Sequence, residues 1–231
     1  MKRPTEYPHP ALAVDVVCLC IQDGAVQCLL MPRDDAAEVG GDWALPGGFV
    51  RQGDSLEATL ARVLAEKVGL GRVHAEQLAT YSALDRDPRD HVVSVTYLAI
   101  AEAASFAEPV ARGLRLARIA VDWPGETGGP ARALSGDAVL RLAFDHGAIL
   151  GDVIKRLRGK LDYAPTGFGF LPPRFTLRDA QEVHEAILGH ALNKPAFRRK
   201  LLDRHALQAT GAFETGGAYR PAELYEVKEK E

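Results

Sequence analysis

Short apolar runs of β type fill the first half of the chain. Residues 12–21 and 26–31 are predicted strands, and Asp23-Gly24 between them is a typical hairpin turn. Further strands are predicted at 78–84, at 91–101 and at 118–121, where the last one is expected to close the sheet. This pattern predicts a mixed sheet that opens with a hairpin.

Helical periodicity occurs once inside this sheet region. Residues 55–68 predict an amphipathic helix with Glu66 and Lys67 as its solvated edge. Its predicted core positions are Leu56, Leu60, Val63 and Leu64. Residues 122–136 are rich in Gly and Pro and lack a period, so they predict a loop. A helix with a basic polar face is expected from about 139 to 161, and we place the division at 140, giving domains 1–140 and 141–231.

The end of the chain has the element order of a winged helix. Thr176 and Asp179 predict a capping box for a helix that ends at Gly189. A second helix is predicted over 193–204, with Phe197 and Leu201 as its buried stripe. Two β-like runs around Gly216-Gly217 then predict a hairpin. In such a fold the second helix enters the major groove and its cations contact phosphates.

Charge and cysteine usage narrow the class of protein. Residues 151–231 carry 14 Lys and Arg and 11 Asp and Glu, whereas residues 1–150 carry 14 Lys and Arg and 20 Asp and Glu. A polyanionic partner is therefore expected to bind residues 151–231. Cys18, Cys20 and Cys28 lie in apolar runs without ligand spacing, which predicts reduced core residues. No segment approaches the roughly 20 apolar residues of a membrane span, and the start lacks a signal peptide's apolar run. We expect a cytoplasmic protein that does not associate with membranes.

The segment GGFVRQGDSLEATLARVLAEKVGL, residues 47–70, resembles the Nudix box. A Gly-led loop at Gly48 is followed by Asp54 and then by Arg62, as in that family. The positions of the three family glutamates read Val63, Glu66 and Lys67, which lie on one helix face. The resemblance implies a Nudix-like α/β/α sandwich with a mixed sheet.

The changes at residues 63 and 67 bear on metal binding. In Nudix enzymes the glutamates hold Mg²⁺ against a diphosphate, and such a cation prefers oxygen ligands. Val63 offers no oxygen, and an ammonium about 4 Å from a divalent ion costs several kcal/mol at a dielectric constant of about 20. We therefore expect no catalytic residues and no required cofactor. Mg²⁺ matters only if Glu66 binds it weakly, together with Asp54 or a distant acid such as Glu102 or Glu108.

Nearly the whole chain resembles the Nudix-related transcriptional regulators, bacterial repressors of NAD-metabolism genes with a Nudix sensor domain and a winged helix-turn-helix domain. The second part of the resemblance rests on LAFDH at 142–146, the run from 157 to 177, NKPAFRRKLL at 193–202 and RPAELY at 220–225. It implies DNA contacts at Lys194, Arg198, Arg199, Lys200 and Arg220. It also implies an effector pocket bordered by Arg33, Gly47, Gly48, Asp54, Arg62 and Glu66.

Three functions remain open from the sequence. The leading hypothesis is a homodimeric regulator that binds a double-stranded DNA operator and senses ADP-ribose or a related nucleotide or sugar. The alternative is a Nudix hydrolase that cleaves ADP-ribose-like nucleoside diphosphates through a non-standard metal site. A third is a ligand-binding protein without DNA activity. His146 is expected to be a hydrogen-bonding residue rather than a catalytic one, and neither Ser94 nor Ser135 has a nucleophile motif.

Overall fold

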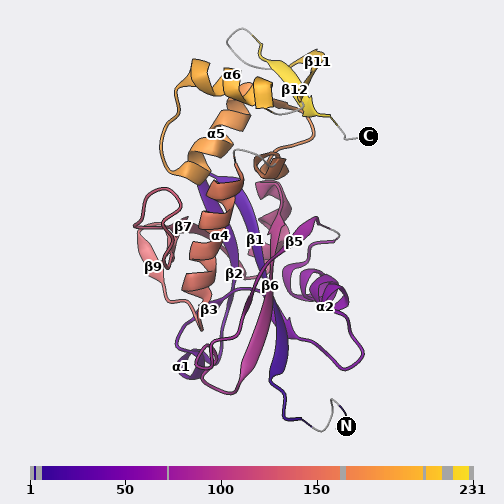
Figure 1. Cartoon of the computed structure of the whole chain (residues 1–231), viewed down its shortest axis with the longest axis vertical. Helices are drawn as coiled ribbons and strands as arrows, with labels where there is room; N and C mark the ends of the chain where they lie inside the picture. The colour runs from indigo at the N-terminus through magenta and orange to yellow at the C-terminus, as the bar shows by residue number, and fades with distance from the viewer. Residues whose placement is uncertain are drawn as a thin grey trace.

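The computed structural model describes residues 3, 7–71, 73–161, 165–204, 207–214 and 221–228. The molecule is elongated, with a large sheet at one end and a smaller helical domain at the other (Figure 1). Helix α4 lies against the sheet and runs along the long axis toward the smaller domain (Figure 1). None of the helices in these ranges is long and apolar enough to cross a membrane.

Nine strands of the described chain form one mixed sheet in the order β5-β6-β1-β2-β7-β8-β9, with β3 paired to β2 and β4 paired to β1. The strands are β1 (Ala11–Gln22), β2 (Ala25–Pro32), β3 (Trp43–Ala44), β4 (Gly47–Phe49), β5 (Ala75–Tyr81), β6 (Val92–Ile100), β7 (Arg115–Ala120), β8 (Arg132–Ser135) and β9 (Ala138–Leu140). Strand β1 is antiparallel to β2 and parallel to β6. The predicted hairpin is confirmed, with Asp23 and Gly24 both at positive φ in its two-residue turn.

Two expectations about the edge of this sheet are wrong. The strand predicted at 118–121 does not close the sheet, because β7 pairs with β2 on one side and with β8 on the other. Strand β8 lies inside the predicted loop 122–136, and β9 occupies the predicted start of the connecting helix. Both strands are short and turn at Gly136, so their pairing depends on tertiary neighbours rather than on a local apolar run.

Helices cover both faces of the sheet, which confirms the α/β/α prediction. One face packs against α2 (Leu56–Val63) and its π-helical continuation η2 (Leu64–Val68), and the other against α4 (His146–Lys160). The remaining short helices of this domain are α1 (Ala36–Val39), η3 (Ala103–Phe106) and α3 (Ala107–Ala111). Cys18, Cys20 and Cys28 are buried as predicted. Burial raises the pKa of the Cys18 and Cys20 thiols to about 12, which keeps them protonated.

Helix α4 begins at His146 rather than near residue 139. Its apolar side, with Ile149, Val153 and Leu157, lies in the same core cluster as the sheet. Val183 and Ile187 of α5 (Leu177–Leu188) join that cluster. The predicted division at 140 falls between β9 and α4, so the connector helix contributes to the core of the sheet domain and also contacts α5.

The second domain has a core of its own. After η4 (Pro165–Phe170) come β10 (Phe175–Thr176), α5, α6 (Lys194–Arg204), β11 (Leu207–Phe213) and β12 (Glu223–Val227). Strand β12 pairs with both β10 and β11. The predicted capping box is confirmed, since Asp179 N–H donates to Thr176 Oγ1 at 3.1 Å and Thr176 N–H donates to Asp179 Oδ2 at 2.8 Å. The predicted turn at Gly216-Gly217 lies outside the described residues.

Candidate functional site

A polar cavity of about 140 Å³ lies where β1, β4 and the start of α4 meet. Segments far apart in the sequence contribute to it, including η2 and the loop before β6. Its polar and aromatic lining residues are Asp15, Arg33, Phe49, Lys67, Arg86, Asp87, Arg89, Phe144 and His146. The backbone of Gly47 and Gly48 forms part of its wall.

A buried ionic network forms the floor of this cavity. Ser94 Oγ donates to Asp15 Oδ2 at 2.6 Å, and the same oxygen lies 3.4 Å from Arg86 Nη2. Arg86 also donates two hydrogen bonds, of 2.8 and 3.0 Å, to the carboxylate of Asp145. The Arg86 side chain is only 4% exposed, so its charge depends on these partners. The network fixes the residue before α4 to the middle of the sheet.

Two arginines flank an aromatic ring at the rim. Arg33 pairs with Asp35, and Arg89 pairs with Asp87 and Asp35. Their guanidinium carbons lie 5.6 and 5.3 Å from the ring centroid of Phe144. Phe144 has φ +56, a conformation that aromatic residues rarely adopt. Residues with strained backbone conformations cluster at functional sites, which makes this rim a candidate binding site.

His146 connects the start of α4 to the loop that precedes the Nudix box. The backbone N–H of Leu45 donates to its Nδ1 at 3.0 Å, so this nitrogen carries no proton. Burial lowers the pKa of the imidazole, which favours the neutral ring. The prediction that His146 is a hydrogen-bonding residue is confirmed.

The box helix places Lys67 differently from the prediction. Lys67 is half-buried in the cavity wall, not on a solvated edge, and its ammonium donates to the carbonyl oxygen of Gly47. Burial lowers the pKa of Lys67, and the charges of Arg33 and Arg62 lower it further. A Cβ on Gly47 would lie 2.2 Å from Asp15 Oδ1, so only glycine fits between the carboxylate and this wall.

Half of the predicted effector residues line the cavity. Arg33, Gly47 and Gly48 do so, whereas Asp54, Arg62 and Glu66 do not. Arg62 instead holds the Gly-rich loop, because its Nη2 donates to Phe49 O at 2.8 Å and its Nε lies 3.8 Å from Asp54. Glu66 is exposed on the helix.

The residues of the box do not fit a magnesium ion. Val63 is buried in the core, the ammonium of Lys67 lies at the loop carbonyl, and Asp54 faces Arg62. Across the residues that the structure describes, no three His, Cys, Asp or Glu side chains gather where they could hold a metal. Glu66, Glu102 and Glu108 are therefore not part of any such group of three in the described ranges. We derive no metal-dependent step for this protein.

The sequence reasoning missed most of the cavity's polar residues. One signal was present for Asp15, which is the single charged residue in the apolar run 11–21. A buried charge in a strand needs partners, and these are Ser94 and Arg86. The run DRDPRD at 85–90 supplies Arg86, Asp87 and Arg89 in a loop with no periodic signal.

A helix-turn-helix forms the second candidate site. Helix α5 ends at Gly189, which has φ +79. The turn that follows is held by Glu185, whose carboxylate accepts from Leu192 N–H at 2.8 Å. Asn193 caps α6, since Ala196 N–H donates to its Oδ1 at 3.1 Å. The orientation of α6 is thus fixed by side-chain hydrogen bonds at its start.

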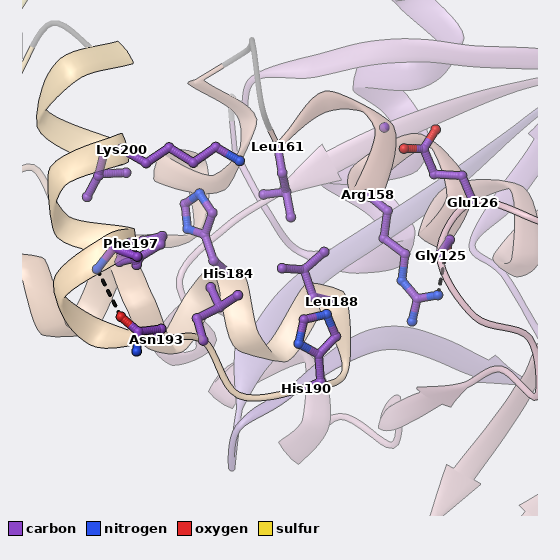
Figure 2. A pocket seen from close by; sticks show the side chains of 14 residues that line it. Gly125, Glu126, Arg158, Leu161, His184, Leu188, His190, Asn193, Phe197 and Lys200 are labelled. Carbon is purple, nitrogen blue, oxygen red and sulfur yellow. Dashed lines mark hydrogen bonds between the residues drawn. The ribbon is translucent and has the colours of Figure 1, made fainter.

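The residues predicted to contact DNA differ in how exposed they are on α6. Phe197 and Leu201 are buried as predicted, and Lys194 and Arg199 are exposed. Arg198 is half-buried. Burial raises the pKa of Tyr225 in β12, and the charge of Arg198 lowers it in part, which places Arg198 near the wing. Lys200 is exposed beside a cavity between α4 and α6 (Figure 2). Arg220 lies outside the described residues.

The cavity beside Lys200 lies where the two domains meet and has a volume of about 540 Å³. Arg158 is one of its lining residues (Figure 2). Its Nε donates to Ile187 O at 3.0 Å, and its Nη1 to Gly125 O at 2.9 Å and to Trp123 O at 3.3 Å. Its guanidinium also lies 5.1 Å from the Trp123 ring centroid. One side chain of α4 therefore contacts both domains.

The fold and the two sites define a two-domain protein in which a Nudix domain carries a winged helix. The NUDIX domain family matches residues 9–113, and the NrtR DNA-binding winged helix domain matches residues 167–227. The chain belongs to the family of Nudix-related transcriptional regulators that contain this winged helix.

Relatives match the chain almost end to end. The "ADPR responsive transcriptional repressor NtrR" of Acinetobacter baylyi is 33% identical over 96% of this chain and 84% of its own. Shewanella oneidensis NrtR, solved with a 27mer DNA, has a TM-score of 0.74 and 31% identity, covering 94% of this chain and 93% of its own. A MutT/nudix family protein from Enterococcus faecalis has a TM-score of 0.77 and 27% identity, covering 97% and 90%.

Proposed function

We propose that this protein is a DNA-binding transcriptional repressor whose Nudix domain senses ADP-ribose or a closely related nucleotide. One observation carries the proposal: both domains and their relative arrangement match Shewanella oneidensis NrtR, which was solved bound to DNA. The name of the Acinetobacter baylyi relative adds both the repressor role and the response to ADP-ribose. Genes of NAD metabolism are the proposed targets.

The DNA-binding role is assigned to α6 and the adjoining wing. Lys194 and Arg199 are exposed cations on the second helix of the helix-turn-helix, the position that enters the major groove in this class. Arg198, Lys200 and Arg220 remain proposed contacts. We propose that the protein binds as a homodimer, because two such helices about one DNA turn apart read a palindromic operator.

The ligand-binding role is assigned to the polar cavity of the Nudix domain. Cations from several segments face it, including Arg33, Lys67 and Arg89. Phe144 adds an aromatic ring at the rim. A diphosphate with attached ribose groups has the charge and the hydrogen-bonding surface that such a lining recognises.

Helix α4 is the proposed connection between the two sites. At its start, Asp145 and His146 contact the buried network and the loop before the Nudix box. Near its end, Arg158 contacts the C-terminal end of α5. A ligand that binds one conformation of the start of α4 more tightly shifts the winged helices toward the matching arrangement. The change in DNA affinity is then set by the difference between the ligand's affinities for the DNA-binding and the non-binding conformations.

The hydrolase alternative has one supporting comparison. An ADP-ribose pyrophosphatase from Methanocaldococcus jannaschii is 36% identical over 98 residues, which cover 42% of this chain and 55% of its own. Val63 and Lys67 argue against that activity, since they replace two oxygen ligands of the family pattern. Incubation with ADP-ribose and Mg²⁺ tests it directly, and the repressor proposal expects no release of AMP.

DNA binding is tested by fluorescence anisotropy with a labelled duplex from the gene's own upstream region. The full-length protein should bind this duplex at least a thousandfold more tightly than a scrambled duplex of equal length at the same salt concentration, within the usual range of specificity. Equal affinity for both duplexes would leave the third hypothesis, a ligand-binding protein without regulatory DNA activity.

A further inference from the structure

The cations of the Nudix cavity differ in how their charges are balanced. Arg33 is paired with Asp35, Arg86 with Asp145 and Arg89 with Asp87. Lys67 has no carboxylate within ion-pair distance among the described residues, and its ammonium donates a hydrogen bond to the carbonyl oxygen of Gly47. A carbonyl orients an ammonium but does not cancel its charge, and the carboxylates of Asp15 and Glu66 act on Lys67 only from beyond ion-pair distance. Among the described residues, Lys67 is therefore the cation of this cavity that no carboxylate contacts directly.

The position of Lys67 places this charge at the Gly-rich loop. Its side chain leaves η2, and its ammonium ends at the carbonyl oxygen of Gly47, in a cavity wall that Asp15 and Gly48 also line. The half-buried ammonium is only partly hydrated, which strengthens its interaction with an anion in the cavity. The charges of Arg33 and Arg62 lower the pKa of Lys67 and those of Asp15 and Glu66 raise it in part, so an anion bound in the cavity would stabilise the charged ammonium.

We propose that the ammonium of Lys67 takes the place of a divalent cation and that the cavity binds the diphosphate group of its effector without metal. The box residues do not offer the oxygen ligands of a metal site, yet a diphosphate still needs positive charge beside it. Lys67 supplies that charge from the very position where the family pattern has a glutamate. The inference rests on the proposed function for the identity of the ligand. The negative charge of the ligand follows from the cavity itself.

Isothermal titration of the full-length protein with inorganic pyrophosphate and with ADP-ribose, in EDTA and in excess Mg²⁺, tests this inference. The wild-type protein should bind both compounds in EDTA, and Mg²⁺ should not tighten binding more than about threefold. Lys67→Met should weaken binding in EDTA by about 10- to 100-fold, the usual effect of losing one charged hydrogen bond. Lys67→Arg keeps the charge and should stay within about fivefold of the wild type.

Lys155→Met is the matched control, because Lys155 is an exposed lysine of α4 that does not line this cavity. It should bind both compounds as the wild type does. If Lys67→Met does not fold, as judged by its thermal unfolding, Lys67→Gln replaces it, since the amide can still donate to Gly47.

The outcomes separate this inference from the proposed function. Binding that requires Mg²⁺, or equal affinity in Lys67→Met and the wild type, overturns the inference, while a response of DNA binding to ADP-ribose would still support the repressor. Binding of pyrophosphate in EDTA that depends on Lys67, without binding of ADP-ribose, supports the inference and overturns the proposed effector. Failure to bind either compound overturns both.

Discussion

Arg158 Nε donates a hydrogen bond of 3.0 Å to the carbonyl oxygen of Ile187, which joins the connector helix α4 to the last turn of α5. The other end of the same guanidinium binds the carbonyls of Trp123 and Gly125 in a loop of the sheet domain. The side chain thus satisfies carbonyls on both sides of the domain boundary. Any rotation of the winged helix against the sheet domain must change at least one of these bonds.

Replacing Arg158 should therefore reduce the communication between ligand and DNA. In Arg158→Ala we expect the effect of ADP-ribose on DNA affinity to fall by about fivefold or more, within the usual range of coupling free energies. ADP-ribose affinity itself should stay within about twofold, because Arg158 does not line the Nudix cavity. Anisotropy with and without ligand, together with calorimetry, measures both quantities.

Arg156→Ala provides the control for this experiment. Arg156 also lies on α4 and donates to a carbonyl, that of Leu78 at 2.9 Å, but this partner belongs to the sheet domain. The control should retain the full response of DNA binding to ligand. Equal loss of response in both variants would show that general destabilisation of α4, not the contact with α5, causes the effect.

Arg199 should contribute to DNA affinity through phosphate. Arg199→Ala is expected to weaken operator binding and to make the slope of log K against log salt concentration less steep by about 0.9, the value for one lost phosphate contact. Arg141→Ala removes an exposed charge from the sheet domain, where Arg141 pairs with Asp42, and should leave the slope unchanged. An unaltered slope in Arg199→Ala would show that Arg199 does not contact a phosphate.

Gly47→Ala should destabilise the protein and remove ligand binding. The new Cβ would lie 2.2 Å from Asp15 Oδ1 and 3.0 Å from Val14 O, so the loop must move away from β1. We expect the free energy of unfolding in urea to fall by about 1–3 kcal/mol, as for other overpacked sites. In Gly48→Ala the nearest atom is Val63 Cγ2 at 3.3 Å, so its loss should be smaller. A larger loss in Gly48→Ala would contradict this account of the loop.

His146 should make stability depend on pH on the acidic side of neutrality. Burial lowers its pKa in the folded state, although Asp15 and Asp145 raise it in part. The unfolded chain therefore binds the proton more readily, and stability falls as pH drops below about 6.5, by at most about 1.4 kcal/mol per pH unit.

Urea unfolding at pH 7.5 and 5.5 measures this loss. His146→Asn keeps an acceptor for the Leu45 N–H but does not titrate, so its stability should change less between the two pH values. The same loss in the variant and in the wild type would assign the dependence to other groups.

The sequence predicted the fold correctly at positions where the local residue pattern and the tertiary packing favour the same structure. The hairpin at Asp23-Gly24, the capping box at Thr176 and the buried stripe of α6 each depend on residues close together in the chain. Strands β8 and β9 were missed because short segments next to glycines acquire their pairing from β7, which lies earlier in the sequence.

The Nudix cavity was predictable in its loop and at Arg33. Gly47 and Gly48 belong to a recognisable motif, whereas Arg86, Phe144 and His146 come from separate segments that only the folded sheet brings together. Asp54 and Arg62 belong to the motif as well, but they support the loop from outside the cavity. The missed residues make specific contacts through burial and charge pairing, and neither property follows from spacing along the chain.

Anisotropy of the labelled upstream duplex, titrated with protein at fixed salt in the presence and absence of ADP-ribose, tests the central claim most directly. The account predicts tight, salt-sensitive binding that ADP-ribose weakens by at least about fivefold, which corresponds to a typical coupling free energy of 1 kcal/mol or more. Tight binding that ADP-ribose leaves unchanged would contradict the assignment of the Nudix domain as a sensor of this nucleotide.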